Sequence, residues 1–279
     1  MITALDHFVL LCPDIKAATE DYATLLGLPV TWQADADGVA TSIFVVGNTA
    51  IELTAPSGTG PVADKLREMT QDGPQLTTLV YRSDDLATDH HLMTRRGLRP
   101  SEISDGASTH LGSGQSRTWR RFRVPDEIMA GVKTFLLEPE EALPVSAASS
   151  GGVTALDHLV INTPNPERAV ANYGARLGLR FALDRTAEQW KTRFMFFRLG
   201  GMTLEVIHRL GETHDPSGPD SIWGLTWETD DLEAAHSRLA SMGRDVSEIR
   251  TGRKPGTTVF TVRDYTQGVP TLFIAHAKR

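Results

Sequence analysis

The chain has 279 residues, of which 40% are hydrophobic and 23% charged, a composition typical of a folded globular protein with room for two cores. The formal net charge of −7 speaks against the basic surface that nucleic-acid binding requires. No run of residues is long and apolar enough to predict a membrane span. We therefore expect a cytoplasmic protein, monomer or homodimer, whose partner is a small-molecule substrate, not nucleic acid or a membrane.

The single cysteine, Cys12, ends an apolar run at residues 8–12. One cysteine excludes an internal disulfide, and the apolar surroundings indicate a reduced, buried thiol. A catalytic role for this thiol is not expected.

A sequence repeat divides the chain into two halves of one plan. The residues Thr-Ala-Leu-Asp-His occur at 3–7 and again at 154–158. Further matches follow in the same order in both halves, with insertions and deletions between them. The small residues between the copies have the composition of a flexible linker. We therefore predict one domain at 1–146, a linker at 147–153 and a second domain at 154–279.

The first half begins with a buried strand at 7–11, followed by a helix whose apolar residues recur at helical spacing from Ile15 to Leu26 and which Gly27 ends. Three short strands are then predicted at 30–33, 41–46 and 50–54. This order defines a βαβββ unit.

After a helix predicted at 61–69, the same order starts again. The pattern predicts a strand at 76–81, a helix at 86–97 and strands that end at 132–137. Each half therefore contains two such units, and the chain contains four.

The motifs of these units resemble those of the vicinal oxygen chelate superfamily, which includes glyoxalases, bleomycin-resistance proteins and extradiol dioxygenases. Leu-Asp-His lies on the first strand, Leu-Gly closes the helix, and Ile-Glu-Leu at 51–53 or Leu-Glu-Val at 204–206 lies on the last strand. The resemblance implies an α+β fold of two glyoxalase-like domains, whose curved mixed sheets form cups. It also implies a divalent metal, bound in the cup by His and Glu from the first and last strands.

Carried over to this sequence, the resemblance implies His7, Glu52, His158 and Glu205 as metal ligands. It also makes Glu52 and Glu205 the candidate bases for proton transfer. Imidazole and carboxylate together suit iron, manganese, nickel or zinc. The alternative is that each His–Glu pair is a buried hydrogen-bonded pair that holds no ion.

The second unit of each half departs from the family pattern. The first-strand position holds Thr78 or Gly224, and the last-strand position holds Phe135 or Leu272. Cups built from consecutive units therefore offer one His and one Glu each. If the first and third units face each other instead, all four ligands meet in one shared site. Both arrangements stay open.

Cationic and aromatic side chains are candidates for substrate binding. Strand alternation at 116–124 places four of them on one face, where guanidinium groups suit a carboxylate or a phosphate. The four are Arg117, Trp119, Arg121 and Arg123. The alternative is a solvated strand face. We predict substrate contacts from Trp119, Arg121, Trp223 and Thr78.

His276 shares a strand face with Leu272 by the two-residue period, which would bring it to the mouth of the second cup. Its place near the C-terminus favours an exposed side chain instead.

The function implied by the resemblance is a metal-dependent lyase or isomerase of the glyoxalase type, in which the ion polarises a substrate carbonyl. One alternative is a metal-free protein that sequesters an aromatic metabolite or antibiotic, as bleomycin-resistance members do. Another is an extradiol dioxygenase-like enzyme. The ligands missing from the second units favour the binding protein, and the ligands kept in the first units favour an enzyme.

Overall fold

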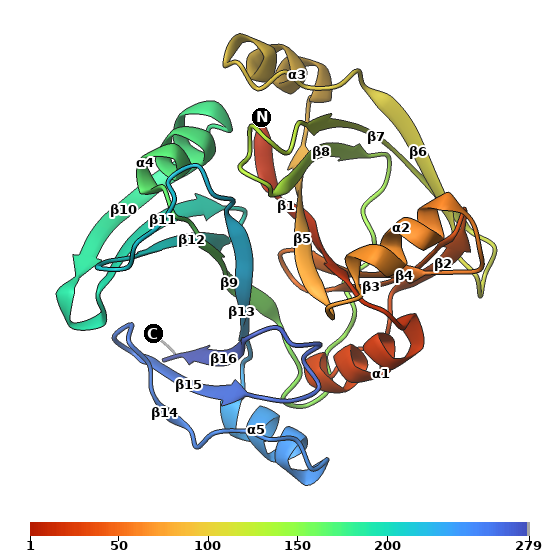
Figure 1. The fold of residues 1–279 in the computed structure, drawn as a ribbon. Helices are drawn as coiled ribbons and strands as arrows, with labels where there is room; N and C mark the ends of the chain where they lie inside the picture. The colour runs from red at the N-terminus through yellow and green to blue at the C-terminus, as the bar shows by residue number, and fades with distance from the viewer. Residues whose placement is uncertain (278–279) are drawn as a thin grey trace.

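Two eight-stranded sheets form the framework of the computed structural model, which describes residues 1–277 (Figure 1). In the N-terminal half the helices are α1 (Ile15–Leu26), α2 (Pro61–Met69) and α3 (Leu86–Arg95). The strands of this half are β1 (Ile2–Leu11), β2 (Trp32–Ala36), β3 (Val39–Val45), β4 (Ala50–Pro56), β5 (Gln75–Ser83), β6 (Ser104–Thr109), β7 (Ser116–Val124) and β8 (Lys133–Pro139).

The C-terminal half repeats this order without a counterpart of α2. Its helical segments are α4 (Pro166–Ala169), the π-helical η1 (Val170–Arg176), the short η2 (Glu188–Trp190) and α5 (Leu232–Ser241). Its strands are β9 (Ala155–Asn162), β10 (Arg180–Ala187), β11 (Thr192–Leu199), β12 (Met202–Arg209), β13 (Ser221–Glu228), β14 (Arg250–Thr251), β15 (Thr257–Val262) and β16 (Thr271–His276). None of the helices within residues 1–277 is long and apolar enough to cross a membrane.

The strand order is the same in both sheets. The first sheet runs β2-β3-β4-β1-β5-β8-β7-β6, and the second runs β10-β11-β12-β9-β13-β16-β15-β14. In each sheet the first strands of two consecutive units pair antiparallel at the centre, and each unit's last strand pairs parallel with its first. The predicted α+β fold of four βαβββ units is confirmed.

Local signals in the sequence account for the first helix. The Asp14 side chain accepts hydrogen bonds from the backbone amides of Lys16 and Ala17, at 2.8 and 3.1 Å, and so caps the N-terminus of α1. Gly27 ends the helix with a φ of 65°, in the left-handed region that favours glycine.

One apolar core is shared by both halves. It lies between the helices and one face of each sheet, and the rings of Phe8 on β1 and Trp227 on β13 meet across it with centroids 6.1 Å apart. The opposite faces carry only small apolar clusters, one around Trp32 and Ile43 and one around Val160. These opposite faces are the concave insides of the cups, where polar side chains remain available for chemistry.

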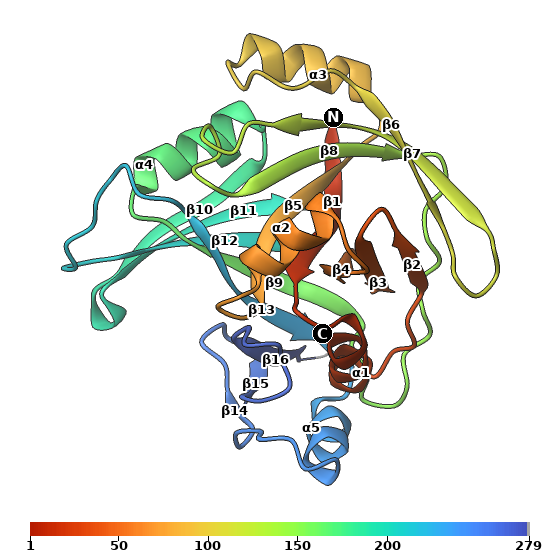
Figure 2. The same ribbon diagram turned by 45° about the vertical axis from the view of Figure 1, so that its right-hand side comes forward.

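Hydrogen bonds to backbone groups join the two halves. The Asn48 side chain, in the turn before β4, accepts from the backbone amide of Leu156 and donates to its carbonyl, both at 2.9 Å. Arg238 on α5 donates to the carbonyls of Thr24 and Leu25 at the end of α1. The two helices lie next to each other in Figure 2. The halves therefore contact each other through specific polar bonds as well as through the core.

Residues 147–153 connect β8 to β9, and their glycines are packed rather than loose. The amide of Val153 donates to the carbonyl of Leu26 at 2.8 Å, and Val153 is 2% exposed. A Cβ on Gly151, which has a φ of 68°, would lie 2.4 Å from the backbone nitrogen of Ala235. Residues 151–153 therefore do not behave as the expected flexible linker, because small residues here allow close approach to α1 and α5.

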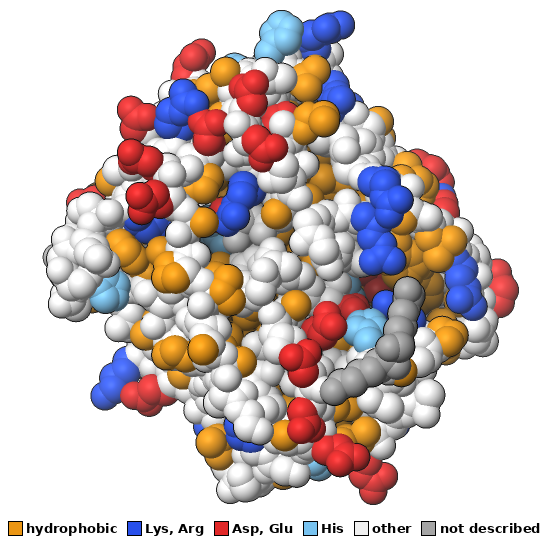
Figure 3. All heavy atoms as spheres, turned by 180° about the vertical axis from the view of Figure 1, so that it is seen from behind, with side chains coloured by type: hydrophobic (Ala, Val, Ile, Leu, Met, Phe, Trp, Pro, Cys, Tyr) orange, Lys and Arg blue, Asp and Glu red, His pale blue; other side chains and the backbone are white. Residues whose placement is uncertain are grey.

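Charged side chains of both signs occur on the face drawn in Figure 3. Basic side chains are scattered over it, while acidic side chains gather near its upper edge and in a run toward its lower edge. This view agrees with the mildly acidic balance of the sequence.

Replacing Asn48 with Ala should lower the free energy of unfolding by about 1–3 kcal/mol, because the amide and carbonyl of Leu156 would lose their partners inside the contact between the halves. Urea denaturation would measure the change. Gln71→Ala is the control, since Gln71 is exposed and its side chain makes no hydrogen bond within residues 1–277. Equal stability of Asn48→Ala and the control would contradict the role of Asn48.

Cys12 should resist thiol reagents in the folded protein. Burial raises the pKa of its thiol to about 12, with the Asp14 carboxylate adding to the effect, so the reactive thiolate is scarce at mildly alkaline pH. Labelling with a chromogenic disulfide should be negligible in buffer and should reach one thiol per chain in denaturant. Rapid labelling of the folded chain would show that this part of the core opens.

Candidate functional site

Each half brings one predicted His–Glu pair together on the concave face of its sheet. Parallel pairing of β1 with β4 sets Glu52 beside Val9, two residues from His7, and the His7 Nε2 to Glu52 Oε2 distance is 3.8 Å. The corresponding distance between His158 on β9 and Glu205 on β12 is 3.7 Å.

The two pairs remain in separate cups. Because each sheet is made of consecutive units, His7 and Glu52 belong to one sheet and His158 and Glu205 to the other. The shared site that would need the first and third units in one cup does not form.

An aspartate orients each histidine. The distance from His7 Nδ1 to Asp6 Oδ1 is 2.7 Å, and that from His158 Nδ1 to Asp157 Oδ1 is 2.6 Å. A carboxylate only accepts, so Nδ1 carries the hydrogen and the lone pair of Nε2 faces the glutamate. Metal-bound histidines are oriented by carboxylates in this way. The sequence prediction missed both aspartates, although the repeated Leu-Asp-His motif contains them.

These aspartates stay ionised despite their burial. Burial raises the pKa of Asp6, but hydrogen bonds and charge interactions with His7 and Arg82 outweigh it and hold this pKa at about 2. For Asp157, burial again opposes ionisation, and bonds from His158 and His276 bring the pKa well below its ordinary value.

The two cups differ at the residue beside this aspartate. Arg82 on β5 pairs with Ala4 in the strand register, and Glu228 on β13 pairs with Ala155, the repeat equivalent of Ala4. Arg82 donates from Nε and Nη2 to Oδ2 of Asp6, both at 2.8 Å. An arginine thus neutralises the aspartate of the first cup, whereas the second cup has a further carboxylate at this place.

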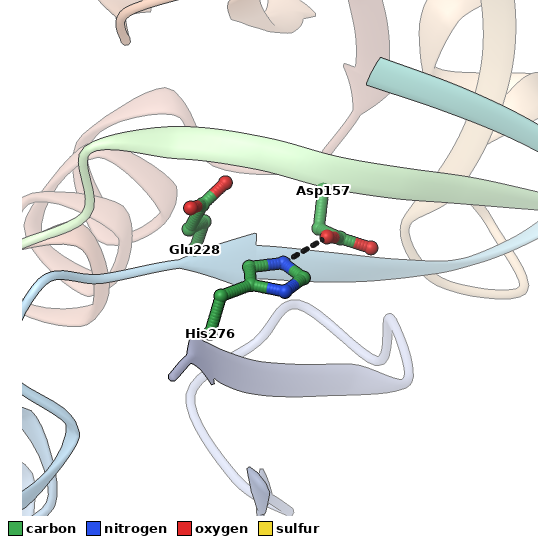
Figure 4. Close-up of side chains that lie close together, drawn as sticks. All are labelled: Asp157, Glu228 and His276. Atoms are coloured by element: carbon green, nitrogen blue, oxygen red, sulfur yellow. Dashed lines mark hydrogen bonds and ion pairs between the residues drawn. The ribbon is translucent and has the colours of Figure 1, made fainter. Parts of the chain in front are cut away.

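In the second cup a histidine takes the place of this arginine as the partner of the aspartate. His276 Nε2 lies 2.7 Å from Asp157 Oδ2, and one ligand atom from each of Asp157, Glu228 and His276 lies within 4.8 Å of the others (Figure 4). The three side chains come from the neighbouring strands β9, β13 and β16. They form the only such group of His, Cys, Asp or Glu within residues 1–277. The expectation that His276 is exposed was wrong, because its side chain is 31% exposed and bound to Asp157.

The residues across from the histidines also differ between the cups. Val80 pairs with His7, while Thr226 pairs with His158 and its Oγ1 lies 2.9 Å from His158 Nε2. Thr78, two residues before Val80 on β5, pairs with Val9.

The last strands of the second units offer only apolar side chains at this level of the cups. Phe135 is the register partner of Val80, and Leu272 is that of Thr226. Gly224 pairs with Val160, two residues before Thr226 on β13 and in continuous register with it. Neither of the second units places a His or a carboxylate directly across from the histidine of its cup.

Aromatic rings line the second cup next to Glu205. Phe196 is the register partner of Glu205 on β11, its ring stacks with that of Phe194 at 6.1 Å, and Trp190 meets Phe194 edge-on. Burial raises the pKa of Glu205, while the charges of His158 and of Arg253 partly offset this rise.

The first cup contains a cavity of about 340 Å³, whose charged lining residues are Arg82, Arg117, Asp6 and Glu141, together with His7 and mainly apolar side chains. Arg117 lies on the predicted face of β7, where its guanidinium carbon is 4.9 Å from the ring centroid of Trp119 and 5.9 Å from that of Trp32. It was not among the residues predicted to contact substrate, because alternation alone does not tell which of four side chains borders a cavity.

The four residues predicted to contact substrate are spread over different environments. Trp119 is half-buried beneath Arg117, and its indole nitrogen has no hydrogen-bond partner within residues 1–277. Arg121 is exposed, 5.4 Å above the ring of Phe135. Thr78 is 7% exposed, and Trp223 is 44% exposed.

Solved structures with the same fold come from several enzymes. A triple mutant of 4-hydroxymandelate synthase from Streptomyces coelicolor aligns over 100% of this chain and 94% of its own, with a TM-score of 0.69 and 13% identity. The Mn(II)-bound glyoxalase from Novosphingobium aromaticivorans aligns over 99% of this chain and 83% of its own, with a TM-score of 0.67 and 15% identity. At these identities the likeness shows the fold alone. None of the curated proteins searched matches the sequence.

Two family models match the chain in tandem. A model described as "Glyoxalase-like domain" matches residues 5–155, more than half of the chain. A second, described as "Glyoxalase/Bleomycin resistance protein/Dioxygenase superfamily", matches residues 157–261. The chain therefore belongs to the glyoxalase, or vicinal oxygen chelate, superfamily as a tandem of two glyoxalase-like domains.

Proposed function

We propose that the protein is a metal-dependent lyase or isomerase of the glyoxalase type, and that its divalent ion binds in the second cup on His158 and Glu205. The observation that carries this proposal is the convergence of two acceptor atoms, His158 Nε2 and Glu205 Oε2, at 3.7 Å. The Mn(II)-bound glyoxalase with the same fold supports it.

The donor set of the second cup fits a divalent cation. With Nδ1 of His158 donating to Asp157, the facing atoms of His158 and Glu205 both carry lone pairs, and only the Thr226 hydroxyl can supply a hydrogen to Nε2. Two atoms that each bind one ion at about 2.1 Å can be as far apart as these two are. Imidazole with carboxylate suits manganese, iron, nickel or zinc.

The charges around the two cups favour the second one for a cation. Asp157 lies beside His158, and Glu228 lies close to Asp157, while the nearest cations on this side, Arg253 and Lys254, are exposed. In the first cup, by contrast, arginines lie beside the His–Glu pair. Because charges at such distances interact strongly in a partly buried site, a divalent ion is stabilised in the second cup and opposed in the first.

When bound, the ion would supply Lewis-acid polarisation of a substrate carbonyl. Glu205 is the residue suited to accept a proton from the substrate at its carboxylate. Burial raises its pKa, which increases its affinity for a proton. The rings of Phe194, Phe196 and Trp190 provide an apolar wall for the substrate's body and keep water from the carboxylate. Asp157 holds His158 in the tautomer that leaves Nε2 free.

A second position for the ion is the group of Asp157, Glu228 and His276 at the rim of the same cup (Figure 4). It offers three ligand atoms, one more than the His158–Glu205 pair, but engaging all three would give up the bond between His276 and Asp157. An extradiol-type site would need a second histidine beside His158, a place that Thr226 occupies.

Elemental analysis of untagged protein, incubated with Mn²⁺ and then desalted, should find one ion per chain. His7→Ala should keep this ion, and His158→Ala should lose it, because the second cup has the carboxylate of Glu228 where the first cup has the guanidinium of Arg82. Loss in His7→Ala with retention in His158→Ala would refute the assignment to the second cup. No ion in any variant, with manganese, iron, nickel or zinc, would favour the metal-free binding protein.

The two positions in the second cup are separated by Glu205→Gln and Glu228→Gln. We expect Glu205→Gln to remove the ion, and Glu228→Gln to weaken its affinity only modestly through the lost charge. His276→Ala should weaken binding by about 10- to 100-fold, the usual effect of losing an outer hydrogen-bond partner. Titration with Mn²⁺ followed by electron paramagnetic resonance gives the affinities. The opposite ranking of the two glutamine variants would move the ion to the rim.

A further inference from the structure

The first cup contains a cavity that the proposed metal chemistry does not use. Its volume of about 340 Å³ lies at the small end of the range for ligand pockets. Arg82 and Arg117 border it from β5 and β7, on either side of β8 in the sheet, with His7 alongside. The cavity therefore combines a size suited to a small molecule with two cationic groups.

Only one of the two guanidinium groups is free. Arg82 donates twice to Asp6, so its charge is already neutralised. Arg117 is half-buried and forms no ion pair with any carboxylate within residues 1–277. Burial lowers its pKa, and the charges of Glu52 and Asp6 partly oppose this lowering without forming an ion pair with it. A partly desolvated cation without a partner is costly unless an anion binds to it.

Aromatic rings hold this guanidinium in place. The Trp32 and Trp119 rings lie 5.9 and 4.9 Å from its carbon, distances at which a cation is attracted to a ring. A Cβ on Gly106 would lie 2.4 Å from the Trp119 indole nitrogen, so the glycine makes room for this ring. Arg117 is thus held by its neighbours while its charge remains unpaired.

The remaining walls are mainly apolar. Ile43, Val45 and Leu143 line the cavity, and Gly200 in the turn between β11 and β12 closes it from the second half. Glu141 also borders it, with its side chain exposed to solvent. A ligand that fits these walls has an apolar body and a polar group at one end.

We propose that the first cup binds a small organic monocarboxylate, whose carboxylate pairs with Arg117 and whose apolar body lies against Ile43 and Val45. One free guanidinium matches one negative charge and can bind a carboxylate through two parallel hydrogen bonds. A phosphate dianion would leave a second charge unmatched in the cavity. The first domain is then a ligand-binding domain in its own right, beside the metal-binding second domain.

Benzoate is the probe for this site, with uncharged benzamide as its near isostere. The titrations follow tryptophan fluorescence and the melting temperature in the presence of a chelator, so that the outcome does not depend on the second cup. We expect saturable binding of benzoate, a higher melting temperature, and at least tenfold weaker binding of benzamide, because a hydrogen bond to a charged group contributes about 1.5–3 kcal/mol.

Arg117→Met and Arg120→Met are the matched variants. Arg120 lies on the same strand but is exposed and paired with Glu138. Arg117→Met should weaken benzoate binding tenfold or more, and Arg120→Met should leave it unchanged. If Arg117→Met does not fold, Arg117→Lys serves in its place and should also weaken binding, because it loses the paired hydrogen bonds.

The following results would overturn the proposal. They are equal binding of benzoate and benzamide, an unchanged benzoate affinity in the Arg117 variants, and tighter binding of inorganic phosphate than of benzoate. Failure of benzoate to bind at any accessible concentration would also contradict it. None of these results bears on the metal site, which has its own variants in the other half.

Discussion

The alternation of side chains along the central strands determines which groups enter the core and which face the cups. On each strand one set of residues enters the core shared by both halves, so the other set must face the concave side of its sheet. Phe8 and Ile51 lie in the core, and their neighbours His7 and Glu52 therefore face the cup. A shift of one residue in register would exchange these roles and bury the charged groups.

The same backbone plan supports two different electrostatic environments. Arg82 and Glu228 occupy matching register positions beside the aspartate of the Leu-Asp-His motif. With arginine, the aspartate is neutralised and the cup gains a second, free cation in Arg117. With glutamate and His276, the second cup gathers negative charge around its His–Glu pair. We propose that substitutions at a few positions direct one cup toward an anion and the other toward a cation.

Much of the fold follows from the sequence, because its signals are local. Helix caps such as Asp14 and Gly27, apolar periodicity and the repeat itself give the elements and their order. The four ligand candidates followed from the family resemblance that the repeated motifs carry, because that family binds its metal through residues of the first and last strands. Packing of the glycines near Gly151 was missed, because the same small residues suit both a loose linker and a close contact.

The rest of the candidate site depends on contacts between distant strands, which a single sequence does not encode in any local pattern. His276 reaches Asp157 from the last strand of the chain, and Arg82 reaches Asp6 from the first strand of the next unit. β-Bulges add to the difficulty, because register shifts in β1, β9 and β13 change which residues face each other. Because the two central strands of each sheet are antiparallel, Val80 and Thr226 lie across from the two histidines, whereas Thr78 and Gly224 pair with Val9 and Val160.

We infer that the two cups have diverged and that the cation site lies in the second one. Anomalous X-ray diffraction from crystals of the intact chain soaked in Mn²⁺ tests it most directly, because this signal locates the ion without reference to activity. We expect one strong peak between His158 and Glu205 and none between His7 and Glu52. A peak in the first cup, or peaks of equal height in both, would contradict it.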